Sequence, residues 1–313
     1  MNTVVLVCIG NFQEYILINL QFLIRLQHKS IVVLTQRAFF PLFHFPDSFI
    51  NLEPHEVSQL NSEFKSYVQL IAVEDLQDEF NYLSKTNMDS SFRNGFWTHA
   101  SMRFFYLYSY MKKYNVENVI HIENDVMIFY NVSVLEPYLH GNAKIYLPFD
   151  SYERNIASIM FIPTGELLGR VLEQYDSKLN DMQNFVVISK RFPEWIDSFP
   201  IFILGVERGN PEIDFVCKNY HTFGGFLFDG AAIGQYLGGI DPANCSSNKS
   251  TVGFVNETCV IKYNKYNFYW KLIDGVFCPF MVISSHPSIG DGKLEFPIFN
   301  LHAHCKDLKT FIL

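Results

Sequence analysis

The chain has 313 residues, of which 49% are apolar, enough to bury a large core. It carries 24 basic and 32 acidic residues, for a formal net charge of -8. No run of Lys and Arg is long enough to follow a phosphate backbone, so nucleic acid is not an expected partner. A phosphorylated substrate stays compatible with this charge if a cation and a few basic residues neutralise its phosphates.

The first residues predict a strand and not a targeting signal. Val4 to Ile9 is too short to span a membrane, and neither a basic lead nor a small-residue cleavage site accompanies it. The six cysteines include no Cys-x-x-Cys pair, which disfavours a zinc ribbon or a thioredoxin-like motif. We therefore expect a cytoplasmic protein with reduced thiols and no membrane span.

Continuous apolar runs alternate with helical patterns along the chain. The expected strands are residues 4–9, 31–34, 68–73, 116–122, 144–149 and 158–162, and residues 297–306 look extended. The expected helices are residues 14–27, 95–114 and 166–179, part of 181–199, and a short helix within 224–241. Such runs are typical of parallel strands covered on both faces. They predict an α/β, Rossmann-like fold with a mainly parallel central sheet flanked by helices, in a single domain over residues 1–313.

Two carboxylates follow the expected strand at residues 116–122. Glu123 and Asp125 lie two positions apart, so an extended backbone projects both to the same side. Carboxylate oxygens are the ligands that magnesium and manganese prefer, and ligands of parallel sheets bind beyond the carboxyl ends of strands. A hard-cation site is therefore predicted here, with a merely solvated acidic loop as the alternative.

A second group of polar residues lies near the end of the chain. In the extended segment 300–306, alternate positions present an amide, two imidazoles and an ammonium on one face. These residues are Asn300, His302, His304 and Lys306. Each histidine alone is more often a buried, hydrogen-bonded side chain than a ligand. A His-x-His zinc site of a hydrolase is a rival interpretation, although that motif usually lies early in a barrel.

The segments Glu123-Asn124-Asp125 and Asn300-Leu301-His302-Ala303-His304-Cys305-Lys306 resemble motifs of the GT-A glycosyltransferases. In that family an acidic DxD-type motif, here with Glu in the first place, chelates the metal that holds the diphosphate of a nucleotide sugar. The resemblance implies a GT-A-like domain, a Mn²⁺ or Mg²⁺ cofactor, and metal ligation by Glu123, Asp125 and one of His302 and His304. It also implies that Lys306 meets the diphosphate.

The same resemblance places further residues at the nucleotide sugar. Ile9, Gly10 and Asn11, which end the first expected strand, would lie near the base and ribose, and Asn124 belongs to the acidic motif itself. Arg103 lies in a helix too apolar for an unpaired charge, so it requires a partner. It meets the diphosphate, organises the carboxylates, or forms a purely structural salt bridge to Glu123 or to another buried acid.

Asp229 follows Gly224, Gly225 and Phe228 ahead of an expected short helix. It is either the carboxylate that removes the acceptor's proton, as an inverting enzyme requires, or a helix cap. The resemblance implies transfer of a hexosyl or pentosyl group from a nucleotide-diphosphate sugar to a hydroxyl of a glycan or glycoconjugate. The alternatives are a metal-dependent hydrolase that uses His302 and His304, and a noncatalytic sugar-binding module.

Overall fold

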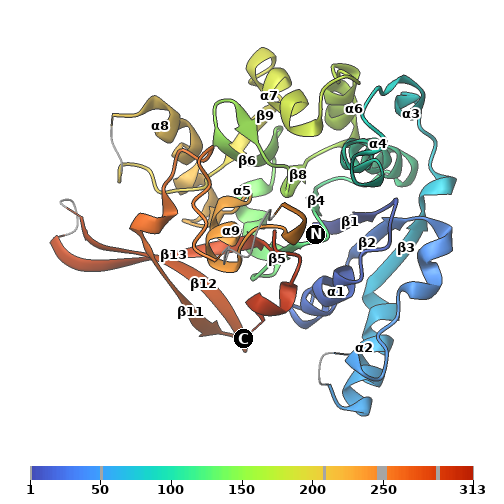
Figure 1. The fold of residues 1–313 in the computed structure, drawn as a ribbon, viewed down its shortest axis with the longest axis horizontal. Coiled ribbons are helices and arrows are strands. Elements are labelled where there is room, and N and C mark those ends of the chain that lie inside the picture. The colour runs from blue at the N-terminus through green and yellow to red at the C-terminus, as the bar shows by residue number, and fades with distance from the viewer. Residues whose placement is uncertain (1, 50–51, 207–208, 245–251, 287–289, 313) are drawn as a thin grey trace.

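A central sheet runs through the molecule (Figure 1). The computed structural model describes residues 2–49, 52–206, 209–244, 252–286 and 290–312, and within these ranges eight strands form this sheet in the order β3-β2-β1-β4-β8-β6-β7, with β9 beside β6. The strands are β1 (Thr3–Cys8), β2 (Ile31–Thr35), β3 (Val68–Ala72), β4 (Val119–Ile122), β6 (Ile145–Ser151), β7 (Arg154–Asn155), β8 (Ile159–Ile162) and β9 (Ile196–Phe199). Neighbours β3, β2, β1 and β4 are parallel, as are β6 and β9, whereas β8 and β7 run antiparallel to their partners.

Helices cover both faces of the sheet, as its mostly apolar strands predict. Every residue of β2, β4 and β8 is buried. In Figure 1, α4, α6 and α7 group on one side of the sheet, and α1 and α2 lie on the other. The helices are α1 (Tyr15–Arg25), α2 (Pro54–Tyr67), α3 (Tyr82–Lys85), α4 (Phe96–Tyr114), α5 (Glu136–Leu139), α6 (Gly165–Glu173), α7 (Asp181–Arg191), α8 (Pro211–Cys217) and α9 (Ala232–Gly238). The predicted α/β class with a mainly parallel central sheet is confirmed.

A second sheet carries the carboxyl-terminal part of the chain. Its strands are β10 (Leu227–Phe228), β13 (Gly290–His302), β12 (Val276–His286) and β11 (Asn267–Ile273), in that order, and β5 (Val126–Ile128) also pairs with β13. In the antiparallel register of β5 and β13, Val126 lies opposite His302. Because β5 begins directly after Asp125, this pairing brings the two predicted motifs together.

One predicted helix was too long, and the strands β9, β11 and β12 were not predicted. Residues 174–179 are not helical, because Asn180 starts a new helix with a capping box to Gln183. The prediction that residues 181–199 are helical in part is confirmed by α7, and residues 196–199 form a parallel edge strand beside β6. The long hairpin of β11 and β12 was not predicted, because the pattern of β11 mixes exposed and half-buried residues.

The buried apolar side chains of both sheets belong to one contiguous cluster. Within the described ranges, no helix is both long enough and apolar enough to cross a bilayer. The single domain and the cytoplasmic location stay predictions.

Candidate metal centre

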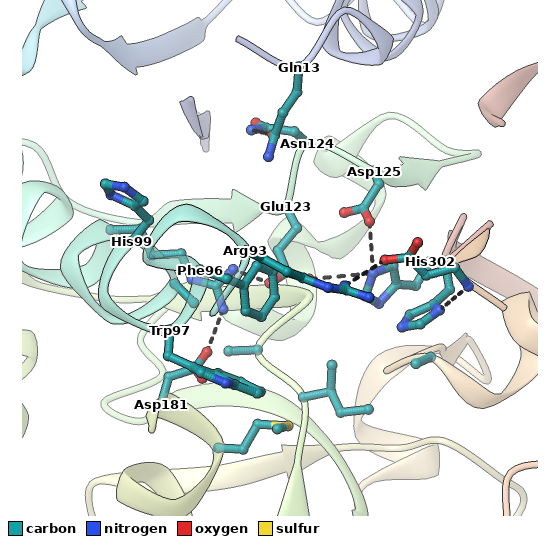
Figure 2. A pocket seen from close by; sticks show the side chains of 18 of the residues that line it. Gln13, Arg93, Phe96, Trp97, His99, Glu123, Asn124, Asp125, Asp181 and His302 are labelled. Carbon is teal, nitrogen blue, oxygen red and sulfur yellow. Dashed lines mark hydrogen bonds and ion pairs between the residues drawn. The ribbon is translucent and has the colours of Figure 1, made fainter. Parts of the chain in front are cut away.

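A cavity of about 430 Å³ opens where β1 and β4 end (Figure 2). The residues after these strands, the first turns of α4 and the segment after β13 all contribute to its wall. Of the predicted site residues, the cavity wall includes Ile9, Arg103, Glu123, Asn124, Asp125, His302, His304 and Lys306. These residues come from four segments that are distant in the sequence, and the fold brings them together at one edge of the sheet.

Glu123, Asp125 and His302 form a cluster in this cavity. One potential ligand atom from each of them lies within 4.8 Å of the others. The Nε2 atom of His302 is 3.2 Å from Oδ2 of Asp125 and 3.6 Å from Oε2 of Glu123. The other ring nitrogen, Nδ1, lies 2.7 Å from the carbonyl oxygen of Gly230, which directs Nε2 to the carboxylates. Two carboxylates and one imidazole form a donor set that fits Mn²⁺ or Mg²⁺.

His304 lies apart from this cluster. Its Nδ1 atom accepts a hydrogen bond from the backbone N–H of Asp241 at 2.9 Å, and its ring centroid is 5.5 Å from that of His302. Among the described residues, the metal-binding cluster therefore includes His302 and not His304. The sequence could not separate the two, because alternate residues of a strand point to the same side.

Backbone and amide contacts fix the loop that carries the carboxylates. The N–H of Ala303 donates to the carbonyl of Asp125 at 2.7 Å, next to the pairing of β5 with β13. From helix α1, the buried amide of Asn19 donates to the carbonyls of Asn124 at 3.1 Å and Val126 at 2.9 Å. This role of Asn19 was not predicted, although a polar residue on the apolar face of a helix indicates a buried hydrogen bond.

Two basic side chains balance the charge of Asp125. Nζ of Lys306 and Nε2 of His302 both contact its carboxylate. Burial alone would raise the pKa of Asp125, but Lys306 and then His302 hold it well below its usual range. Burial likewise opposes protonation of His302, yet Asp125 and Glu123 raise the pKa of this histidine to about 9. At neutral pH, His302 is therefore protonated before a metal binds.

We predict that Mn²⁺ affinity rises with pH because a metal ligand must lose its proton. His302 is protonated below its pKa of about 9, so calorimetric titration should show affinity increasing about tenfold per pH unit below that value. His302→Gln should bind weakly and with a smaller slope. His304→Ala is the matched control and should keep the slope, since burial lowers the pKa of His304 to about 4. A pH-independent affinity of the unmodified protein would contradict ligation by His302.

Arg103 holds Glu123 in place. Its guanidinium pairs with the carboxylate of Glu123 and, at 2.9 Å, with Oδ2 of Asp181. The arginine and Asp181 are both buried, and the guanidinium pairs with both acids. Arg103 therefore forms the salt bridge to Glu123, with Asp181 at the start of α7 as a second partner, and a contact of Arg103 with a diphosphate stays a prediction. No local pattern relates Arg103 to Asp181, because the pairing depends on how α4 and α7 pack.

Among the described residues, Asp229 is not one of those that line the cavity. Its carboxylate accepts hydrogen bonds from the N–H groups of Ile233, Gly234 and His302 at 2.9, 2.8 and 3.0 Å. A Cβ atom on Gly234 would come within 2.0 Å of the His302 carbonyl oxygen, so the glycine permits this close approach. The geometry favours the helix-cap alternative, because all three contacts are backbone groups and the side chain is 2% exposed. We therefore assign Asp229 no catalytic role.

Replacing Asp229 with Asn is expected to lower stability and to leave the chemistry intact. The amide turns a donor toward backbone N–H groups, and a buried group left unsatisfied costs about 1 to 3 kcal/mol. Urea unfolding should show this loss, whereas turnover of a nucleotide sugar at saturation should stay within about tenfold of the unmodified protein. Unchanged stability with a loss of turnover beyond about a thousandfold would instead identify Asp229 as a reacting group.

The remaining predicted residues lie around the end of β1. The amide nitrogen of Asn124 donates to the carbonyl of Val7 at 2.9 Å and to Oε1 of Gln13 at 2.5 Å, so it ties the acidic loop to β1. Gly10 adopts a φ of +79°, where its N–H donates to Gln36. Asn11 is exposed and lies outside the described cavity wall. Of this group, the structure brings Ile9 and Asn124 to the cavity.

Comparison with known proteins gives distant likenesses of fold. No protein-family model and no curated protein matches the chain. Mouse xyloside xylosyltransferase 1 is 10% identical over 64% of this chain and 85% of that chain, with a TM-score of 0.38. The glycosyltransferase GlyE of Streptococcus pneumoniae is 13% identical over 64% and 46%, with a TM-score of 0.37. A cytidylyltransferase of Leptospira borgpetersenii is 10% identical over 63% and 75%, with a TM-score of 0.34.

One of these three matches is named as a xylosyltransferase and one as a glycosyltransferase. Their TM-scores are below 0.5, and the function proposed below therefore rests on the geometry of the cavity.

Proposed function

We propose that this chain is a metal-dependent glycosyltransferase that moves a hexosyl or pentosyl group from a nucleotide-diphosphate sugar to a hydroxyl of a glycan or glycoconjugate. The observation that carries the proposal is the cluster of Glu123, Asp125 and His302 in a cavity at the carboxyl ends of β1 and β4. Lys306 borders the same cavity, so a diphosphate bound there would meet a cationic side chain as well as a metal.

Glu123, Asp125 and His302 would hold Mn²⁺ or Mg²⁺. When bound, such an ion neutralises the diphosphate and stabilises the charge that develops on it as a leaving group. In the transfer, the acceptor's hydroxyl oxygen forms a bond to the anomeric carbon, and the bond from that carbon to the diphosphate breaks. The electron pair of the broken bond leaves with the nucleoside diphosphate, and the hydroxyl proton passes to water or to a base.

The protein's own side chains prepare this site before the donor arrives. Arg103 and Asp181 hold Glu123 toward the cavity, so its orientation does not depend on the ligand. Lys306 contacts Asp125, and its side chain is 33% exposed, which leaves the ammonium free to turn toward a diphosphate. We place the nucleoside toward Ile9, Gly10 and Asn11, beyond Asn124, because the end of β1 adjoins the acidic loop there.

The two other candidate functions have less support. A zinc hydrolase would need both imidazoles on one ion, but Nδ1 of His304 accepts a hydrogen bond from the backbone of Asp241. A noncatalytic sugar-binding module would need no cluster of two acids and a histidine in its cavity. The transferase accounts for the acids, the histidine and the lysine together.

A turnover assay tests the proposal. The purified chain is incubated with a panel of UDP-, GDP-, CDP- and TDP-sugars and Mn²⁺, with and without a mixture of free glycans, and nucleoside diphosphate is measured by mass spectrometry. We expect release from at least one donor, a faster release with glycans, and none with a chelator. Release that is insensitive to both chelator and glycans would favour a hydrolase, and no release from any donor would contradict the proposal.

A further inference from the structure

Three aromatic side chains border the cavity on the side of α4. Phe92 and Phe96 are each 42% exposed, and Trp97 is half-buried. All three belong to the cavity wall. In Figure 2, Trp97 and Gln13 lie on opposite sides of Glu123, and we call the part of the cavity beside Trp97 the aromatic half and the part beside Gln13 the half beside β1. The proposed function places the nucleoside in the half beside β1 and leaves the aromatic half unassigned.

The three rings form one fixed surface, which we call the aromatic platform (Phe92, Phe96 and Trp97). The rings of Phe92 and Trp97 are nearly parallel, at 11° with centroids 6.2 Å apart, and Phe96 meets Trp97 edge to face at 5.0 Å. Exposed aromatic rings gathered at a cavity are unfavourable in water unless a ligand covers them. The three exposed rings therefore indicate a surface that a ligand covers.

The backbone before α4 supports the same conclusion. Arg93, Asn94 and Gly95 have φ values of 48°, 57° and 80°, so two residues with side chains adopt the strained left-handed conformation in succession. Strain of this kind persists only where the surrounding structure imposes it, and it concentrates at ligand sites. Here the guanidinium of Arg93 donates to Asp241 at 2.9 Å and to Asn244 at 2.7 Å, which ties the platform to the opposite wall.

The aromatic half suits an uncharged ligand. Its arginines already have carboxylate partners: Arg93 pairs with Asp241, and Arg154 pairs with Asp150 at 3.3 Å. Ile156, Ala157, Met182 and Ala231 add apolar surface to the wall. Apolar walls with a few fixed polar groups are typical of sites for neutral small molecules. A pyranose ring offers a matching surface, because one of its faces carries C–H groups while its hydroxyls point outward.

We infer that the aromatic platform is the acceptor subsite and that it takes the C–H face of a neutral sugar ring. This inference rests on the proposed function, since it requires the donor in the other half of the cavity. Stacking on the platform leaves the hydroxyls of the ring directed along the cavity toward Glu123 and Asp125. The part of the acceptor that the platform binds is therefore a neutral sugar ring.

The test separates acceptor binding from donor binding. Methyl glycosides of glucose, galactose, mannose and xylose, in both anomeric forms, are titrated by saturation-transfer NMR against the full chain with Mg²⁺ and a nucleoside diphosphate. Nucleotide affinity is measured separately by calorimetry. The unmodified protein should bind at least one glycoside. Trp97→Ala should weaken this binding about tenfold or more with nucleotide affinity unchanged, because it removes the central ring of the stack.

Matched variants keep the result interpretable. Tyr114→Ala removes a 43% exposed ring from the far end of the same helix and should bind the glycoside as the unmodified protein does. Trp97→Phe should recover most of the affinity, and Phe96→Ala tests the platform independently if Trp97→Ala does not fold. Glycoside binding that survives both alanine variants would overturn the inference. So would a loss of nucleotide affinity in Trp97→Ala, which would identify the platform as a base-binding surface.

Two failures remain distinguishable. A protein that binds nucleotide and Mg²⁺ but none of the glycosides would refute the acceptor subsite and leave the transferase standing. A protein that binds no nucleotide would refute the proposed function, and the subsite with it.

Discussion

Asp125→Asn is expected to abolish Mn²⁺ binding and, with it, metal-dependent nucleotide binding. Asp125 is 4% exposed and contacts both His302 and Lys306, so it is the central acid of the cluster. The isosteric amide keeps the shape and removes the charge. Since changes to outer-shell partners of metals already cost about 10- to 100-fold in affinity, loss of a ligand should exceed about 100-fold. Calorimetric titration with Mn²⁺ measures the effect.

The fold should survive this change. Without the carboxylate, the ammonium of Lys306 can turn to solvent, and His302 loses its proton more readily because Asp125, the acid that raises its pKa most, is gone. Asp197→Asn is the matched control. Asp197 is similarly buried and pairs with Lys144 and Lys218, but it lies on β9 and outside the described cavity wall. The control should keep full Mn²⁺ affinity, and undiminished binding by Asp125→Asn would remove the metal assignment.

Arg103→Met is expected to cause the largest loss of stability. The change leaves the carboxylates of Glu123 and Asp181 without their shared cation, and breaking a buried pair in this way costs about 3 to 5 kcal/mol. Burial raises the pKa of Asp181, and Arg103 acts to lower it. Its removal should raise that pKa further above the unfolded value. The loss should therefore be smaller near pH 5, where protonation relieves the site, and larger at pH 8.

Urea unfolding of both proteins at pH 5 and pH 8 measures this effect. Arg37→Met is the control, because Arg37 pairs with Asp75 at the surface, where the two side chains are 59% and 49% exposed. Such an exposed pair contributes about 0 to 1 kcal/mol, with little dependence on pH across this range. A cost for Arg103→Met as small as that of the control would mean that Arg103 does not hold Glu123.

The sequence predicts the first half of the fold well because its signals there are local. The strands β1 and β2 are almost wholly apolar, β3 and β4 contain one polar residue each, and α1 and α4 have apolar residues at helical spacing. The edge strand β9 was missed because its sequence, Ile-Asp-Ser-Phe, is short and mixed, and its pairing with β6 depends on a neighbour distant in sequence.

The site is predictable only where its signal lies in a motif. Glu123 and Asp125 were found because they follow an apolar strand, and His302 because of its alternation with Asn300 and His304. Asp229 shows the limit. Its carboxylate caps backbone N–H groups because it contacts those of Gly234 and His302. These contacts cannot be read from the sequence. The role proposed for Trp97 was not predicted either. Its helix is rich in aromatic residues, and many of its apolar residues pack in the core.

The most direct test of the account is the thermal stability of the purified chain with a panel of nucleoside diphosphates and nucleotide sugars, each with Mn²⁺ and with a chelator. A ligand that binds only the folded state raises the unfolding temperature. We predict an increase for at least one nucleotide with Mn²⁺, no increase with chelator, and no increase in Asp125→Asn. Stabilisation that is equal with Mn²⁺ and with chelator, or the absence of any shift across the panel, would contradict the proposed metal-dependent transferase.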